Sequence, residues 1–328
     1  MKKRIISICA LALVFAMISA VSLFGCAKSD RDEALDIMCT VFPLYDWTKN
    51  IVQGVENVNV SLLVKSGADI HSFQPSFSDM AAIRNSDVVI YVGGESDKWI
   101  EESLGEKTVA IKLSELSNMT LYEVSSDSIA QAHTHEDGVE CHESHEHEEG
   151  FDEHIWLSVK NARTACDAIG KALAELKVSA ADSLISNTQR YADSLLPLDA
   201  RMEALSSNIN EPLIFADRFP FVYLFEDYGI DYYAAFDGCT TDTNADFDTV
   251  IGLANRLSSA EKKYVFTTEA PNAALSDSVI RESKTQALVI SLDSMQSIGA
   301  QNMESSSYAD IMERNVTQLE QIFTPQEN

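Results

Sequence analysis

The amino-acid sequence predicts an α/β protein with two lobes, each with a four-stranded parallel sheet flanked by helices, joined by a long helix. Three observations predict this fold. Short apolar runs alternate with helical patterns, which is typical of parallel sheets assembled from βα units. The runs form two groups of four, separated by a long interval of helical periodicity. The length, 328 residues, also exceeds what one hydrophobic core comfortably holds.

The predicted strands are apolar runs bounded by turn-forming residues. The first group comprises 36–41, 58–64, 87–92 and 109–113, and the second comprises 212–216, 231–236, 263–267 and 287–291. In open α/β sheets, ligands bind outside the carboxyl ends of the strands. A two-lobed protein of this kind should therefore bind its ligand between the lobes.

The interval between the two groups predicts long helices. Apolar residues recur at three- and four-residue spacing over 160–176 and 180–207. Pro197 should kink or interrupt the second helix, because proline lacks the amide donor and clashes with the preceding turn. We therefore expect an N-terminal lobe over 36–175, a linking helix over 176–209 and a C-terminal lobe over 210–328.

The N-terminus has the layout of an export signal. Three basic residues at 2–4 precede an uncharged apolar stretch over 5–24, and polar sequence follows. The alternative is a permanent membrane helix, because about 20 apolar residues can span a bilayer. The segment Leu23-Phe24-Gly25-Cys26 resembles a bacterial lipobox and favours cleavage. We expect a signal peptide over 1–25, a lipid on Cys26 and a tether over 26–35, which anchor the protein on the extracytoplasmic face of the cell membrane.

Composition narrows the possible partners. The formal net charge of −27 argues against nucleic acid, whose phosphates require lysine and arginine. This charge is compatible with cation capture, but equally with an acidic surface that keeps the protein soluble. Cysteine is too sparse to indicate a dense disulfide framework, and the spacing does not reveal any pairing.

Residues 125–150 form a low-complexity insert that we expect to be a disordered loop. Five of the seven histidines of the chain lie in it: His133, His135, His142, His145 and His147. Imidazoles beside carboxylates and a thiol are donors that zinc accepts. The loop is therefore predicted to bind zinc as an auxiliary site; the alternative is a merely solvated polar loop.

The two remaining histidines lie in positions that favour a binding site. His71 follows the second predicted strand, in the segment 67–76, and His154 follows the insert, in the segment 152–158. A lone histidine is more often a structural residue than a ligand. Here the flanking Asp69 and Asp152 could each orient an imidazole for metal binding.

These segments, with Val41-Phe42-Pro43-Leu44-Tyr45-Asp46-Trp47 and the C-terminal helix, resemble the zinc and manganese solute-binding lipoproteins of ABC importers. The resemblance runs over nearly the whole mature chain. It implies two α/β lobes joined by a long helix that limits hinge motion. It also implies that His71 and His154 are the first two metal ligands and that Asp293, after the last predicted strand, is the fourth.

The resemblance breaks at the third ligand, where Arg218 stands in place of the family's histidine or glutamate. Arginine stays protonated and has no lone pair to donate. Three remedies are open. Water could complete the site, or Cys239 could substitute, although the residue alone favours Cys239 as a small buried hydrophobe. Alternatively, Arg218 could pair with Glu269 or Asp217, or bind an anion carried with the metal.

The function expected from these residues is capture and release of a metal ion. Two imidazoles and a carboxylate suit zinc better than manganese, and a histidine-rich loop that feeds zinc to this site favours the same ion. The partners would be an ABC permease and its ATPase, because the chain contains neither a P-loop pattern nor multiple spans, and we expect a monomer. The alternative is a surface metal buffer or adhesin-like protein without transport coupling. A zinc hydrolase is disfavoured, because neither HExxH nor GxSxG occurs.

Overall fold

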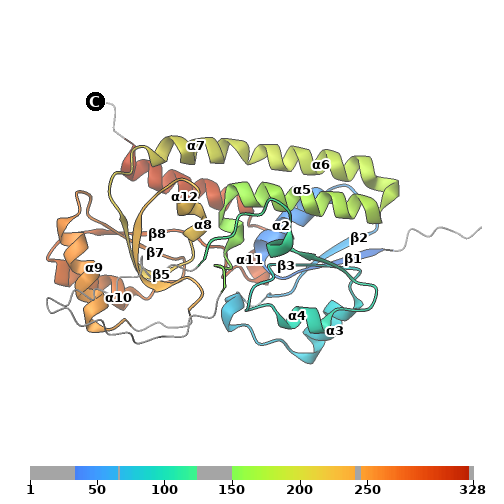
Figure 1. The fold of residues 1–328 in the computed structure, drawn as a ribbon, viewed down its shortest axis with the longest axis horizontal. Helices are drawn as coiled ribbons and strands as arrows, with labels where there is room; N and C mark the ends of the chain where they lie inside the picture. The colour runs from blue at the N-terminus through green and yellow to red at the C-terminus, as the bar shows by residue number, and fades with distance from the viewer. Residues whose placement is uncertain (1–33, 66, 124–149, 241–244, 325–328) are drawn as a thin grey trace, which may run out of the picture. The chain divides into compact units, whose positions relative to one another are not determined.

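The structure, a computed structural model, describes residues 34–65, 67–123, 150–240 and 245–324. Its strands form two separate four-stranded parallel sheets, which confirms the predicted fold class (Figure 1). Among the described residues, none of the helices combines the length and the apolar character that crossing a membrane requires. The proposed signal peptide, Cys26, the tether up to residue 33 and the histidine-rich insert up to residue 149 lie outside the described residues.

The N-terminal lobe has the strand order β2-β1-β3-β4. Its strands are β1 (Leu35–Cys39), β2 (Val58–Leu62), β3 (Val88–Tyr91) and β4 (Val109–Lys112). Its helices are α2 (Phe42–Ile51), α3 (Phe77–Asn85) and α4 (Trp99–Ser103). The central strand β3 is buried throughout, as expected for a strand covered on both faces.

The C-terminal lobe repeats this arrangement with the order β6-β5-β7-β8. Its strands are β5 (Leu213–Phe219), β6 (Tyr232–Asp237), β7 (Tyr264–Thr267) and β8 (Leu288–Ser291). Its helices are α8 (Val222–Glu226), α9 (Phe247–Ser259), α10 (Ala273–Ser283), α11 (Ala300–Met303) and α12 (Tyr308–Phe323). Strand β5 continues three residues beyond the predicted end, because a register shift between Phe215 and Arg218 lets the polar pair 217–218 stay in the sheet.

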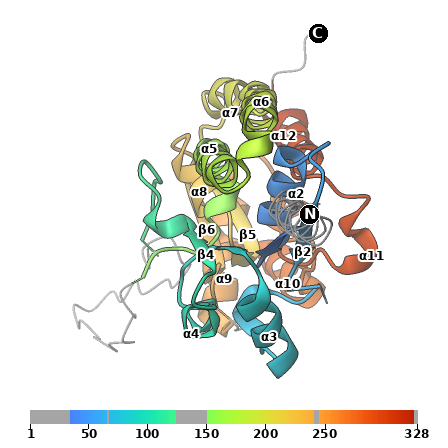
Figure 2. The same cartoon turned by 90° about the vertical axis from the view of Figure 1, so that its right-hand side faces the viewer.

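Three helices connect the lobes: α5 (Val159–Leu176), α6 (Ala181–Ser194) and α7 (Leu196–Ser206). They lie on one side of the two sheets, whereas α3 and α4 cover the opposite face of the N-terminal sheet (Figures 1 and 2). Pro197 is in the first turn of α7, directly after the break at Leu195. The predicted interruption is thus confirmed, because proline is tolerated only where a helix begins.

A continuous hydrophobic core extends from one lobe into the other. Trp47 of α2 and Tyr308 of α12 make an edge-to-face contact with ring centroids 5.2 Å apart. Tyr308 Oη donates to Trp156 O at 2.8 Å, and Trp156 Nε1 donates to Ser294 O at 2.9 Å. Each fully buried aromatic side chain contributes about 2–3 kcal/mol of hydrophobic free energy. The region where the lobes meet is therefore packed as a core, and this packing restrains rotation of the lobes.

Candidate metal site

His71 lies in a turn after β2, at the carboxyl edge of the N-terminal sheet. The turn is a short 3-10 helix, η1 (Ile70–Ser72), whose first backbone groups are capped by Asp69. Asp69 Oδ1 accepts the backbone N–H of His71 at 3.0 Å. This cap directs the imidazole toward the C-terminal lobe, where it is nearly inaccessible to solvent.

His154 lies at the start of a second 3-10 helix, η4 (Ile155–Leu157), which leads into α5. The Asp152 carboxylate accepts two hydrogen bonds from it at Oδ1, from the backbone N–H at 2.9 Å and from Nδ1 at 2.8 Å. Both side chains are fully buried. The ring of Trp156 stands edge-on to His154, with centroids 5.3 Å apart. The orientation of His154 is therefore fixed from two sides.

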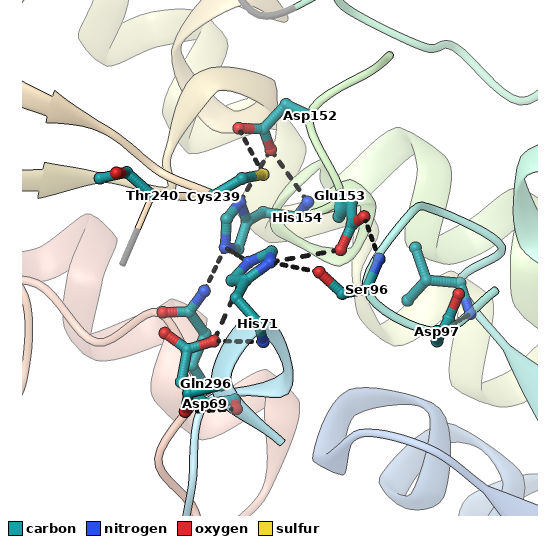
Figure 3. A network of polar contacts seen from close by, with 12 residues as sticks. Asp69, His71, Ser96, Asp97, Asp152, Glu153, His154, Cys239, Thr240 and Gln296 are labelled. Atoms are coloured by element: carbon teal, nitrogen blue, oxygen red, sulfur yellow. Dashed lines mark hydrogen bonds and ion pairs between the residues drawn. The ribbon is translucent and has the colours of Figure 1, made fainter. Parts of the chain in front are cut away.

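The two imidazoles present their Nε2 atoms to each other at 3.2 Å (Figure 3). His71 Nδ1 lies 2.7 Å from Ser96 Oγ and 3.3 Å from Glu153 Oε2, and His154 Nδ1 contacts Asp152. An ionised carboxylate only accepts, so each Nδ1 carries the hydrogen of a neutral ring. Each neutral Nε2 then has a lone pair, and the two lone pairs face each other. Such a pair is stable only around a shared proton or a cation.

The spacing suits a tetrahedral ion. Zinc lies about 2.0–2.1 Å from imidazole nitrogen, so two ligands at tetrahedral angles are about 3.3 Å apart. The observed 3.2 Å agrees with this edge. The ligand atoms of His71, His154 and Cys239 all lie within 4.8 Å of one another. A tetrahedral nitrogen–sulfur edge is about 3.5 Å, so Cys239 Sγ would reach a shared ion with a shift of about 1 Å.

The acid–base properties of the pair follow from burial and from the neighbouring acids. Burial lowers the pKa of His71, and the adjacent His154 lowers it further. Burial is the largest single influence on His154 and disfavours its charged form, but Asp152 and Cys239 together raise the pKa of His154 well above its usual range. The raised pKa of His154 reflects surrounding acids that favour a positive charge at the pair, which a divalent cation would also supply.

Cys239 approaches His154 because Gly238 precedes it. A side chain at residue 238 would collide with Phe219 O at 2.7 Å and with His154 Cε1 at 3.0 Å. Cys239 Sγ lies 3.9 Å from Asp152 Oδ2. Burial raises the pKa of the thiol, and His154 opposes that rise. A bound cation would favour the thiolate.

The structure does not bring Asp293 to the histidines, which differs from the expectation. Asp293 Oδ1 accepts the backbone N–H of Met295 at 2.8 Å, and Oδ2 lies 3.9 Å from Arg314 Nη2. Gln296 reaches the site instead, and its side-chain amide is in direct contact with His154 Nε2 (Figure 3). The physical reason is the turn at Met295, whose φ of 64° reverses the chain and presents the side chain of residue 296.

Arg218 forms its ion pair with an acid other than Glu269 and Asp217. Arg218 Nη1 contacts Asp69 Oδ2 at 2.6 Å. Glu269 instead accepts the backbone N–H and hydroxyl of Ser294 at 2.9 Å. Asp217 accepts the backbone N–H of Arg218, but its other oxygen binds the loop after β7. Both acids are thus held in their own lobe, and Arg218 is left to reach the opposite one.

Residues 37–322 match the family described as zinc-uptake complex component A, periplasmic. The chain belongs to this family. The resemblance predicted from the sequence is thereby confirmed, and the family description names uptake, not catalysis.

Several relatives of this chain have names that describe metal binding. The zinc-binding protein AdcA of Streptococcus pyogenes is 26% identical over 328 residues, covering 97% of this chain and 61% of the relative. The zinc-binding lipoprotein AdcA of Streptococcus pneumoniae is 24% identical, covering 95% and 60%. The chain therefore spans about three fifths of the AdcA proteins that it matches. A putative metal-binding protein of Treponema pallidum is 26% identical, covering 98% and 89%.

Solved structures share the fold of this zinc-uptake family member. The Zn(II)-bound ZnuA-like domain of Streptococcus pneumoniae AdcA matches with a TM-score of 0.67 at 22% identity, covering 89% of this chain and 99% of that one. The periplasmic zinc-binding protein TroA of Treponema pallidum matches with a TM-score of 0.68 at 19% identity, covering 88% and 99%. These likenesses establish the two-lobed architecture.

Sequence reasoning missed three residues of the site: Ser96, Glu153 and Gln296. Ser96 and Glu153 hold Nδ1 of His71, and Glu153 Oε1 also accepts the Ser96 backbone N–H at 2.8 Å. For Glu153, the only indication in the sequence was its position directly before His154. Ser96 and Gln296 carry no sequence signal, because serine and glutamine are common in loops.

Proposed function

We propose that the chain is the extracytoplasmic component of a zinc importer, which binds zinc and delivers it to an ABC permease driven by an ATPase. One observation carries this proposal: two buried imidazoles face each other through Nε2 atoms 3.2 Å apart, while acids and a hydroxyl hold both Nδ1 atoms. Family membership supports it. The ion is cargo, so the protein needs no catalytic group.

The proposed ligands are His71, His154 and Cys239, with Gln296 as a neutral fourth donor. The side-chain amide of Gln296 faces His154 through its nitrogen. Rotation of the amide by a half-turn exchanges nitrogen and oxygen and would offer the carbonyl oxygen to the ion. Asp69 and Asp152 would orient the imidazoles. Sulfur and imidazole donors favour zinc over manganese, which prefers oxygen.

The direct test is zinc titration of His71→Ala and His154→Ala, with metal analysis of the purified protein. Each variant should weaken zinc binding by orders of magnitude, because it removes one imidazole donor that water cannot replace without loss. Arg256, which stacks on Tyr233, offers a matched control: Arg256→Ala should leave binding unchanged. Unaltered titration curves for both histidine variants would remove them from the site.

The thiol is tested separately with Cys239→Ser. A serine hydroxyl is a weaker and harder donor, so zinc affinity should fall while manganese affinity changes little. Equal zinc affinities of variant and wild type would exclude thiolate ligation and return Cys239 to a packing role.

We further propose that the protein acts as a monomer anchored by a lipid on Cys26, with the five histidines of the insert as auxiliary ligands. Loss of the gene should abolish growth on scarce zinc, and His71→Ala should reproduce the defect. Cys26→Ala should release the protein from the membrane. Normal zinc uptake after deletion would favour the surface metal buffer or adhesin-like alternative.

A further inference from the structure

Arg218 joins the two lobes at the edge of the metal site. Its Nη1 lies 2.6 Å from Asp69 Oδ2 across the lobes and 3.3 Å from Thr240 O in its own lobe. The side chains of Arg218 and Asp69 are 24% and 13% exposed. Residues 149 positions apart in sequence are thus held together by a largely buried ion pair.

The ion pair is anchored on both sides. Asp69 uses its other oxygen, Oδ1, to cap the backbone N–H of His71. The backbone N–H of Arg218 donates to Asp217 Oδ1 at 2.9 Å, and Asp217 Oδ2 accepts from the backbone and hydroxyl of Thr268. A displacement of the C-terminal lobe would therefore pull on the turn that carries His71.

The local charge explains why a cation is useful there. The carboxylates of Asp69, Asp152 and Glu153 surround the two histidines. In low dielectric, carboxylates drawn together repel one another unless a positive charge lies among them. A bound dication supplies this charge only while it is present, whereas a guanidinium supplies it permanently.

We propose that Arg218 is a latch that keeps the lobes closed with or without metal, and thereby positions His71 beside His154 before the ion arrives. A protein whose binding conformation is already populated loses no affinity to the closing step. Arg218 is a positioning residue in this role and not a ligand. The proposal rests on the proposed function only for the identity of the ion.

A latched protein needs an entrance that does not require the lobes to separate. A cavity of about 360 Å³ lies beside the site, lined among others by Gly93, Gly94, Glu153 and Cys239. A hydrated ion with six waters occupies about 180 Å³, at about 30 Å³ for each water. The ion can therefore approach Cys239 through this cavity while Arg218 stays paired with Asp69.

The test measures the distance between the lobes by pulsed electron paramagnetic resonance. Spin labels on unnatural keto amino acids at the exposed positions Glu102 of α4 and Asp277 of α10 avoid the native cysteines. In wild type, the distance distribution should be the same with EDTA and with zinc. In Arg218→Met, the EDTA distribution should broaden and shift to longer distances, and zinc should restore the wild-type distribution.

Two controls separate a latch from a general structural role. Arg201 pairs with Glu313 and Glu320 of α12 without joining the two sheets, so Arg201→Met should leave the distances unchanged. Asp69→Asn should open the EDTA form as Arg218→Met does, and the double variant should open it no further.

The outcomes are distinct. An EDTA distribution of Arg218→Met identical to wild type would overturn the latch, as would a wild-type protein that itself closes on adding zinc. Zinc binding is followed in parallel by calorimetry. If no zinc binds, the proposed function fails, but the comparison in EDTA still decides the latch.

Discussion

Replacing Asp152 by asparagine isolates the contribution of one buried carboxylate to the proposed zinc site. Asp152 Oδ1 accepts both the backbone N–H and the Nδ1–H of His154, at 2.9 and 2.8 Å, and the side chain is 1% exposed. Asparagine keeps an acceptor oxygen but not the negative charge that makes the imidazole a stronger donor. Loss of such an outer partner costs about 10- to 100-fold in metal affinity, which corresponds to about 1.4–2.7 kcal/mol.

The assay is competition between the protein and a fluorescent zinc chelator at pH 7, with thermal unfolding of the metal-free protein measured alongside. The matched control is Asp46→Asn, because Asp46 is a buried carboxylate that accepts hydrogen bonds from Tyr191 and Tyr308 and not from a histidine. The reasoning is refuted if Asp152→Asn binds zinc within about twofold of wild type, or if Asp46→Asn loses as much affinity.

Two further predictions concern a proposed ligand and an ion pair away from the site. Gln296→Glu should tighten zinc binding by about tenfold, because an ionised donor interacts more strongly with a dication than a neutral amide does; weaker or equal binding in the same competition assay would show that residue 296 is not a ligand. Arg201→Met should lower the unfolding temperature at pH 7 by about 2–4 °C, as expected for a partly exposed ion pair worth up to about 1 kcal/mol. The hydrogen bond from Arg201 lowers the pKa of Glu320 below its usual 4.5. The stabilisation by this ion pair is therefore complete above pH 4.5 and is lost as the pH falls through the lowered pKa. The temperature difference between wild type and variant should therefore shrink on acidification, and a difference that is constant with pH would contradict the assignment.

The sequence determined the fold class because the signals for it are local. Alternating apolar runs and helical periodicity report which backbone segments are buried, and each predicted run overlaps an observed strand. The break at Pro197 was predictable for the same reason, since a missing amide donor acts within one turn. His71 and His154 were also found from sequence, because each lies in a recognisable segment at the end of an element.

Tertiary structure decided which side chains lie beside the two histidines. Asp293 and Gln296 are three residues apart, and the choice between them depends on the left-handed backbone at Met295, held by Asp293 itself. A positive φ at a residue other than glycine is set by the surrounding packing and carries no sequence signature. The pattern of residues therefore indicated the loop but not which of its side chains reaches the histidines.

The pairing of Arg218 with Asp69 could not be predicted from the sequence. Asp217 is adjacent in sequence, yet it is occupied by backbone and hydroxyl donors of its own lobe. Asp69 becomes the partner only because the core joining the lobes brings β5 against the turn of His71. Sequence alone established that Arg218 could not bind metal. Its partner depended on long-range packing, because a charge pairs with whichever opposite charge the folded chain places within reach.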